Sequence, residues 1–284
     1  MQNYSTKELS NIIYYKLNES KTYLQNYWNN KNSFHADFFY IDDLLPKNIT
    51  EEIYNILLKM NKTLWNKNTS FREKKKGFFE LDKVNVLISN VTEAFHQPNV
   101  INIIESITKI KNLEADPSLY AGGISMMNKD DFLNPHIDNS HDRKKKKYRR
   151  LNLLFYVSPK WEEKMGGNLE LWSKNVKERK TIESKFNRLV VMNANKYSWH
   201  SVSKVKVEQA RCCISNYYFT KNSPENKEYY HVTSFNGRPD ENVKRIYCLF
   251  DNFFRQQISN LFKISRGKNL IRKKLYFSKN FFKV

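Results

Sequence analysis

The chain has 284 residues, of which 40% are hydrophobic and 14% aromatic, and it carries a formal net charge of +20. This composition excludes a wholly disordered chain, and the length suits one enlarged domain or two small ones. Only 7 glycines and 7 prolines are present, which excludes fibrous and linker-dominated classes.

The positive charge has two interpretations. It would attract a polyanionic partner, such as nucleic acid, an acidic glycan or an anionic membrane surface. Lysine and asparagine are abundant along the whole chain, however, and a biased nucleotide composition produces the same pattern. Because the charge is spread along the chain, the compositional interpretation is favoured, and the first one stays open.

The cysteines and the N-terminus indicate a compartment. Cys212, Cys213 and Cys248 are too few and too unevenly spaced for a disulfide framework, which fits a reducing environment. The N-terminus lacks a basic stretch followed by an apolar one, and no apolar run reaches the roughly 18 residues of a transmembrane helix. We therefore expect a cytoplasmic protein.

The N-terminal part is predicted to be mainly helical. Apolar residues recur at helical spacing over 7–28, which predicts one amphipathic helix. Residues 38–41 predict a strand. A second helix is expected over 49–60, with Thr50 and the two glutamates behind it typical of a helix start.

Strands are expected to dominate the middle of the chain. Residues 66–78 are charged and are predicted to form a loop, and a helical region over 83–107 should be interrupted at Pro98. Between 119 and 220 the apolar runs are short and rich in β-branched or aromatic residues, with turn residues between them. This pattern predicts a sandwich or barrel rather than a parallel α/β sheet.

The C-terminal part combines a helix with a basic tail. Residues 240–263 predict a helix with a wide apolar stripe. The last twenty residues alternate basic with apolar and aromatic side chains. This tail could rest on anionic lipid, pack on the core or stay disordered, and a salt-dependent vesicle-binding assay would separate these cases.

Residues 134–138, Asn-Pro-His-Ile-Asp, contain a candidate metal site. Side chains two apart in extended backbone point to the same side, so His136 and Asp138 can reach one point together. An imidazole and a carboxylate are two thirds of the facial triad of non-haem iron oxygenases. The third ligand must come from elsewhere, and His200 lies at the start of the last strand region. The remaining histidines have no comparable partners and are interpreted as structural or surface residues: His35, His96, His141 and His231.

Arg211 adds context to this weak motif. It follows His200 by eleven positions at the head of a predicted strand. Its guanidinium fork suits a terminal carboxylate, which it can bind through two parallel hydrogen bonds. The alternative role of Arg211 is a salt bridge at the rim of the fold.

The run from Leu119 to Thr220 resembles the 2-oxoglutarate/Fe(II)-dependent oxygenase superfamily, in its prolyl-4-hydroxylase-like branch. The resemblance rests on LYAGGISMM, NPHIDNS, RRLNLLFYVSPKWEEKMGGNLELW, FNRLVVMNANKYSWHSV and RCCISNYYFT, in that order. FFYIDDLLP resembles the strand that opens such domains. RPDENVKRIY resembles a C-terminal feature of some bacterial members.

The resemblance implies an α+β fold with a double-stranded β-helix (jelly-roll) core, supporting N-terminal helices and a C-terminal helix. The resemblance covers about residues 38–220 and leaves the first thirty unplaced, and we expect the whole chain to divide into three segments. Residues 1–33 would form a helical extension, 34–220 the oxygenase jelly-roll domain, and 221–284 the C-terminal helix and basic tail.

The resemblance further implies the roles of the site residues. Iron(II) would be held by three ligands, His136, Asp138 and His200. The far carboxylate of 2-oxoglutarate would pair with Arg211, assisted by the hydroxyl of Tyr156. A core aromatic in an alternating strand is the other interpretation of Tyr156. Asn152 faces the same side of the strand, so it is a further candidate for cofactor binding.

The implied reaction consumes dioxygen and the co-substrate 2-oxoglutarate, releases succinate and carbon dioxide, and hydroxylates a substrate, with ascorbate as an optional reductant. The substrate could be a small molecule, a carbohydrate or a peptide. Asp138 favours hydroxylation, since related halogenases carry a small residue there. The basic loop over 139–150 would flank the pocket and could steer an anionic substrate, or it is merely solvated.

Two rival functions remain open. A nucleic-acid demethylase of the same superfamily gains from the positive charge, but its members usually carry further arginines after the keto-acid arginine. Here Arg211 is followed by CCISNYY, so a nucleic-acid partner is disfavoured. The second rival is a non-catalytic jelly-roll binding module, which would have no need of the triad and Arg211 together.

Overall fold

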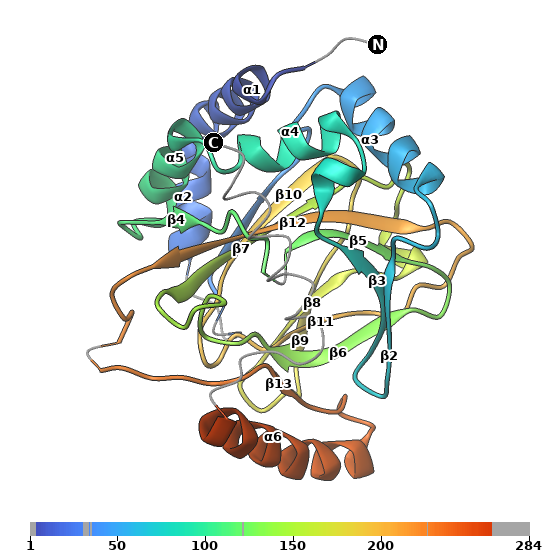
Figure 1. Ribbon diagram of the computed structural model, residues 1–284, viewed down its shortest axis with the longest axis vertical. Helices are drawn as coiled ribbons and strands as arrows, with labels where there is room; N and C mark the ends of the chain where they lie inside the picture. The colour runs from blue at the N-terminus through green and yellow to red at the C-terminus, as the bar shows by residue number, and fades with distance from the viewer. Residues whose placement is uncertain (1–3, 31–33, 35, 121, 226, 263–284) are drawn as a thin grey trace.

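The computed structural model describes residues 4–30, 34, 36–120, 122–225 and 227–262, and shows a curled antiparallel sheet with helices against one side of it (Figure 1). The helices are α1 (Thr6–Glu19), α2 (Lys21–Asn29), α3 (Lys47–Lys59), α4 (Val86–Ala94), α5 (Pro98–Thr108) and α6 (Asn242–Phe262). The strands are β1 (Phe38–Ile41), β2 (Asn66–Thr69), β3 (Glu73–Phe78), β4 (Glu114–Ala115), β5 (Gly123–Met127), β6 (Phe132–Ile137), β7 (Tyr148–Tyr156), β8 (Leu169–Trp172), β9 (Arg179–Ile182), β10 (Arg188–Asn193), β11 (His200–Val202), β12 (Arg211–Thr220) and β13 (Ser234–Phe235). The predicted α+β jelly-roll class is confirmed.

The sheet folds back on itself through one strand. Its order is β1-β10-β7-β12-β5-β3-β6-β11-β8-β9. Strand β3 pairs with β5 through residues 76–78 and with β6 through residues 73–74, so it joins the two halves. The space between the halves becomes the cavity that holds the candidate site.

Strand β7 shows how the sequence defines the two faces. Leu151, Leu153 and Phe155 are buried in the large core shared with the helices. Tyr156 lies in a second core between the halves of the sheet, and Asn152 lines the cavity. The predicted alternation along this strand is confirmed, and it follows from the period-2 direction of side chains in a strand.

Two predicted boundaries among the helices were wrong. The single helix over 7–28 is two helices separated at Ser20, and Leu17 and Leu24 on either side of the break reach the same core. The apolar period continues across the break and hides it. Helix α3 begins at Lys47, directly after Pro46, and not at Thr50. The Thr50 hydroxyl is buried and donates to Asn187 Oδ1 at 3.0 Å, so it fixes tertiary structure instead of capping a helix.

The prediction of a loop over 66–78 was wrong. These residues form the β2–β3 hairpin, in which Asn66 pairs with Gly77 and Thr69 with Lys74. Strand propensity did not reveal it because its lysines and asparagines are only partly buried and its backbone pairs with β5 and β6. Backbone pairing with neighbouring strands, and not the side-chain pattern, therefore determines that these residues form strands.

Helix α6 lies apart from the other helices, along the far edge of the sheet and beside β13 (Figure 1). Within the described ranges, none of the helices combines the length and apolarity needed to cross a bilayer. The predicted tail, residues 265–284, falls outside the described residues. The division of the chain at residues 33 and 220 stays a prediction.

We expect all three cysteine thiols to be unreactive in the folded protein. Cys212, Cys213 and Cys248 are free and buried. Burial raises the pKa of Cys212 to about 12 and also raises the pKa of the other two thiols, so little of the nucleophilic thiolate forms near pH 8. Titration with Ellman's reagent should find no thiol in native protein and three in denaturant. A thiol that reacts in native protein as fast as in denaturant would contradict this burial.

Candidate active site

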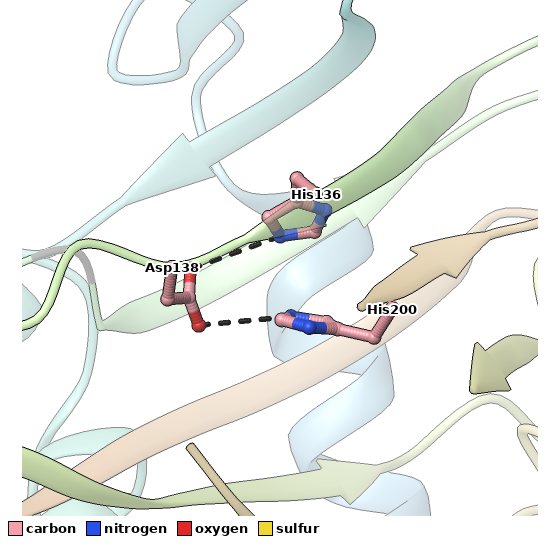
Figure 2. Close-up of side chains that lie close together, drawn as sticks. All are labelled: His136, Asp138 and His200. Carbon is pink, nitrogen blue, oxygen red and sulfur yellow. Dashed lines mark ion pairs between the residues drawn. The ribbon is translucent and has the colours of Figure 1, made fainter. Parts of the chain in front are cut away.

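Three side chains predicted as metal ligands converge where β6 lies beside β11 (Figure 2). His136 is the last but one residue of β6, Asp138 follows that strand, and His200 begins β11, which pairs with β6 in the register His200 to His136. Asp138 Oδ1 lies 3.7 Å from His136 Nε2, and Asp138 Oδ2 lies 3.6 Å from His200 Nε2. Strand pairing thus brings together residues 64 positions apart in the sequence.

Both imidazoles are oriented by their own backbone. His136 Nδ1 donates to the carbonyl of Asn134 at 3.0 Å, and His200 Nδ1 donates to the carbonyl of Ser198 at 2.9 Å. These bonds assign the proton to Nδ1 and leave the Nε2 lone pairs facing Asp138. Burial lowers the pKa of His136 to about 3, so this ring is neutral, as a metal ligand must be.

The group fits iron(II). The three ligand atoms lie within 4.8 Å of one another, and the described residues contain no other group of three or more His, Cys, Asp or Glu side chains with this geometry. Two neutral imidazoles and one carboxylate form a facial triad, which leaves coordination positions open for other molecules. Of the other histidines, His96, His141 and His231 lie outside this group and His35 is not described.

Asp138 is held by two further side chains. Asn152 Nδ2 donates to Asp138 Oδ2 at 2.7 Å, and Arg149 Nη1 lies 3.5 Å from the same oxygen. Burial opposes ionisation of Asp138, but Arg149 and the two histidines outweigh it and hold the pKa of the carboxyl below its usual range. Arg149 is buried and stacks 4.1 Å from the ring of Tyr217. Its position over this ring fixes the guanidinium beside the carboxylate.

Sequence reasoning missed Arg149 because of a β-bulge. Simple alternation would place it with Leu151, on the side of β7 that faces the helices. Tyr218 pairs with Leu151, however, and Phe219 with Arg149, so residue 150 is the extra residue of a bulge. The bulge turns Arg149 to the side of Asn152. The sequence gives no local signal for it within the basic run KKKKYRR.

We expect loss of Arg149 or Asn152 to weaken metal binding without unfolding the protein. Asn152→Ala and Arg149→Met each remove one of the two side chains that hold Asp138 Oδ2, and loss of such a supporting group typically lowers metal affinity by about 10–100-fold. Calorimetric titration with iron(II) under anaerobic conditions measures the effect. Lys147→Met is the matched control, since its partner is Glu114 on another part of the surface. Equal affinities in all four proteins would contradict a supporting role.

Arg211 is a buried cation without a carboxylate partner among the described residues. It begins β12, its Nη2 donates to Ser184 Oγ at 3.4 Å, and its guanidinium lies 4.7 Å above the ring of Tyr156. The Nε atom of Arg211 and the hydroxyl of Tyr156 have no hydrogen-bond partner of good geometry. Burial raises the pKa of Tyr156, so its hydroxyl stays protonated and can donate. Together these donors suit a carboxylate that enters from the cavity.

Two neighbouring residues, Ser184 and Gly167, position the side chain of Arg211. Ser184 is fully buried and its Oγ donates to the carbonyl of Gly167 at 2.7 Å, which leaves the oxygen facing Arg211. Gly167 has φ +66°, and a Cβ atom there would lie 3.2 Å from Arg211 Cγ. Both a positive φ and a close approach therefore require glycine at 167. Ser184 was missed by the sequence reasoning, since a serine between two strands carries no distinguishing signal.

A cavity of about 590 Å³ joins the two parts of the site. Its wall includes the triad, Asn152 and Arg211. This volume lies within the usual range for small-molecule sites. Of the predicted basic loop over 139–150, only Asn139 lines the cavity. The other cations in the wall come from the β2–β3 hairpin (Arg72 and Lys75) and from α6 (Arg255).

Comparison with known proteins gives a family match for the strands of the site. Residues 122–219 match the family model of the 2OG-Fe(II) oxygenase superfamily. These residues include the whole triad, Arg211, Asn152 and Tyr156. No curated protein sequence matches the chain significantly.

Solved structures resemble the chain in fold. A prolyl-4-hydroxylase from Pseudomonas putida is 11% identical, with a TM-score of 0.50 over 69% of this chain and 98% of that one. The epimerase SnoN from nogalamycin biosynthesis is 10% identical, with a TM-score of 0.50 over 78% and 87%. A prolyl hydroxylase from Trichoplax adhaerens is 18% identical, with a TM-score of 0.49 over 76% and 91%. At identities this low, the two structures with a TM-score of 0.50 show similarity of fold and nothing about substrate.

Proposed function

We propose that the protein, whose residues 122–219 match the family model of the 2OG-Fe(II) oxygenase superfamily, hydroxylates a small-molecule, carbohydrate or peptidyl substrate while converting 2-oxoglutarate to succinate and carbon dioxide. One observation supports this most directly. A single cavity contains both a metal triad and a buried arginine that lacks a carboxylate partner among the described residues. The pairing matches a co-substrate with one end for the metal and one for the guanidinium.

The side chains of the site divide into those that hold the metal and those that bind the co-substrate. His136, Asp138 and His200 hold iron(II), which supplies the open coordination positions for the keto acid and dioxygen. Arg211 and Tyr156 bind the far carboxylate of 2-oxoglutarate. Positioning both ends of the keto acid in advance lowers the entropic cost of the reaction.

The remaining residues of the wall control orientation and outcome. Asn152, placed among the cofactor-binding candidates, has its Nδ2 on Asp138, while its Oδ1 has no partner and borders the cavity. We assign it a supporting role for the metal ligand. Asp138 occupies the position that a small residue would leave free for halide, so hydroxylation is the expected outcome. The balanced reaction takes one oxygen atom of dioxygen into the substrate and the other into succinate.

The wall of the cavity favours an anionic substrate. Arg72 and Arg255 share one carboxylate, that of Asp251, and Lys75 pairs with Glu73, so one positive charge is left over apart from Arg211 and Asp138. A carboxylated or phosphorylated small molecule would be attracted by this charge. The demethylase alternative stays disfavoured, because CCISNYY follows Arg211 without further arginines. The expected cytoplasmic location stays a prediction.

The test is an anaerobic titration followed by turnover. Apoprotein receives iron(II) and then 2-oxoglutarate, and the visible charge-transfer band of the chelate is recorded. Oxygen is then admitted and succinate is quantified with pools of anionic metabolites, peptides and methylated oligonucleotides. We expect a band, slow succinate release alone, and faster release with a substrate that gains one oxygen atom by mass spectrometry. A folded protein that gives neither band nor succinate would instead be a non-catalytic binding module.

A further inference from the structure

Helix α6 packs on the protein with its polar side. Asn252 accepts from the Phe235 amide and donates to the Phe235 carbonyl, both at 2.8 Å. Gln256 accepts from the Val232 amide at 2.9 Å, and Arg255 donates to the Thr233 carbonyl. These hydrogen bonds fix the helix beside β13, and the buried Cys248 and the ring of Tyr247, which lies 4.8 Å from that of Phe71, add apolar contacts. The usual orientation of an amphipathic surface helix is therefore reversed.

The apolar side of α6 faces outward. Nine large apolar side chains on this helix are between 53% and 83% exposed. They are Val243, Ile246, Tyr247, Leu249, Phe250, Phe253, Phe254, Ile258 and Leu261. We call this set the α6 stripe. It exposes on the order of 1,000 Å², about twice the largest apolar patch of a typical monomeric protein. A surface of this size predicts a partner.

The charges around the α6 stripe narrow the choice of partner. The charged residues of α6 are engaged within the fold, since Arg255 pairs with Asp251, and Lys244 with Glu241. The sequence that continues from the helix, residues 263–284, contains eight lysines and arginines and no acidic residue. An apolar surface adjoining a cationic segment is complementary to a lipid bilayer with anionic headgroups.

We propose that the α6 stripe docks on an anionic lipid surface, with the helix lying in the plane of the membrane. Phe250 and Phe254 would enter the boundary between headgroups and acyl chains, and the cations of residues 263–284 would bind the headgroups. A second copy of the chain is the less favourable occupant. Two chains of +20 would meet, and eight of the cations in each chain follow the stripe in the sequence, which opposes their association.

Docking through α6 would also determine the position of the cavity relative to the membrane. Arg255, Ile258 and Ser259 of this helix form part of the cavity wall. A membrane bound along α6 would therefore adjoin one side of the cavity. This gives the enzyme access to a substrate that is itself held at a lipid surface.

Vesicle binding tests the proposal with full-length protein. Vesicles of phosphatidylcholine alone and with phosphatidylglycerol are sedimented with wild type, Phe250→Ser/Phe254→Ser and the control Tyr15→Ser/Tyr23→Ser, whose tyrosines are equally exposed on α1 and α2. We expect wild type and control to bind the anionic vesicles. The affinity of the α6 variant for these vesicles should be lower by about tenfold or more. Circular dichroism and thermal melting should be the same for all three, since only exposed side chains change.

A second measurement shows whether something other than a lipid surface covers the α6 stripe. Phe250→Cys places an accessible thiol on the stripe, because the three native thiols are buried, and it is labelled with an environment-sensitive dye. Emission should be that of a water-exposed dye in dilute protein and should shift to the blue with anionic vesicles. Blue emission in a dilute monomer would mean that the chain's own residues 263–284 cover the stripe. A dimer abolished by Phe250→Ser/Phe254→Ser would mean that a second copy covers it. Either result, or equal vesicle binding by all variants, overturns the proposal.

Discussion

Replacing His136 or His200 by alanine is expected to abolish the charge-transfer band and to lower iron(II) affinity by more than about 100-fold, beyond the loss typical of a supporting residue. Each substitution removes one of three ligands whose atoms lie within 4.8 Å. The remaining histidine and Asp138 cannot form the facial triad. Succinate release should fall with metal occupancy, and excess iron should not restore it.

His141→Gln is the matched control for these variants. His141 is also buried, lies three positions after Asp138, and bonds through Nδ1 to Ser140 Oγ at 2.8 Å, away from the metal ligands. It should keep the band and the metal affinity of wild type. Thermal melting of the metal-free proteins separates loss of a ligand from loss of the fold. A His141 variant as defective as the His136 variant would show that the ligand assignment is wrong.

Replacing Arg211 by methionine is expected to separate co-substrate binding from stability. Breaking a buried charge pair costs about 2–5 kcal/mol, so the dissociation constant for 2-oxoglutarate should rise by about 100-fold. The metal-free protein, in contrast, should keep its melting temperature or gain a little, because the variant removes a buried cation that has no carboxylate beside it. Anaerobic titration and thermal melting measure the two effects.

We also expect Arg211→Met to lose most of the stabilisation against unfolding that 2-oxoglutarate gives to the wild type. At a concentration one hundred times its dissociation constant, the keto acid stabilises the wild type by about 2.7 kcal/mol. With binding weakened 100-fold, the same concentration stabilises Arg211→Met by only about 0.4 kcal/mol. Arg188→Met is the control, since Arg188 is equally buried but pairs with Asp42 at 2.6 Å. It should lose about 1–2 kcal/mol of stability and keep its response to 2-oxoglutarate. If Arg211→Met kept its stabilisation by 2-oxoglutarate and Arg188→Met lost it, Arg211 would be excluded as the residue that binds the carboxylate.

The sequence predicted the parts of the fold in which side-chain pattern and backbone agree. Strand β1 was placed at its observed bounds, and the alternation of β7 separated its two faces correctly. The β2–β3 hairpin was missed because strand pairing, not side-chain burial, holds it. Reading α6 as a helix with an apolar stripe was also correct, but periodicity alone does not say which side of a helix meets the protein.

The candidate site was predicted from local chemistry, in which a weak His-x-Asp motif gains support from Arg211. The His-x-Asp pair and Arg211 carry recognisable chemical types at a recognisable spacing, and the structure brings His200 to the pair through the pairing of β11 with β6. Arg149 and Ser184 were not predictable in this way. Arg149 reaches Asp138 only because of a bulge, and Ser184 reaches Arg211 only because of the fold.

The β2–β3 hairpin has a consequence for how such a site changes in evolution. Its residues border the cavity, yet most are only partly buried, and Phe78 alone belongs to the large core. Substitutions at Asn66, Asn68 or Lys75 would therefore alter the surface offered to a substrate at little cost in folding free energy. The predicted ligands His136 and His200, as well as Arg211, lie on strands within the sheet, where most changes are penalised. Selection can thus explore new substrates in the hairpin while the oxidative chemistry stays constant.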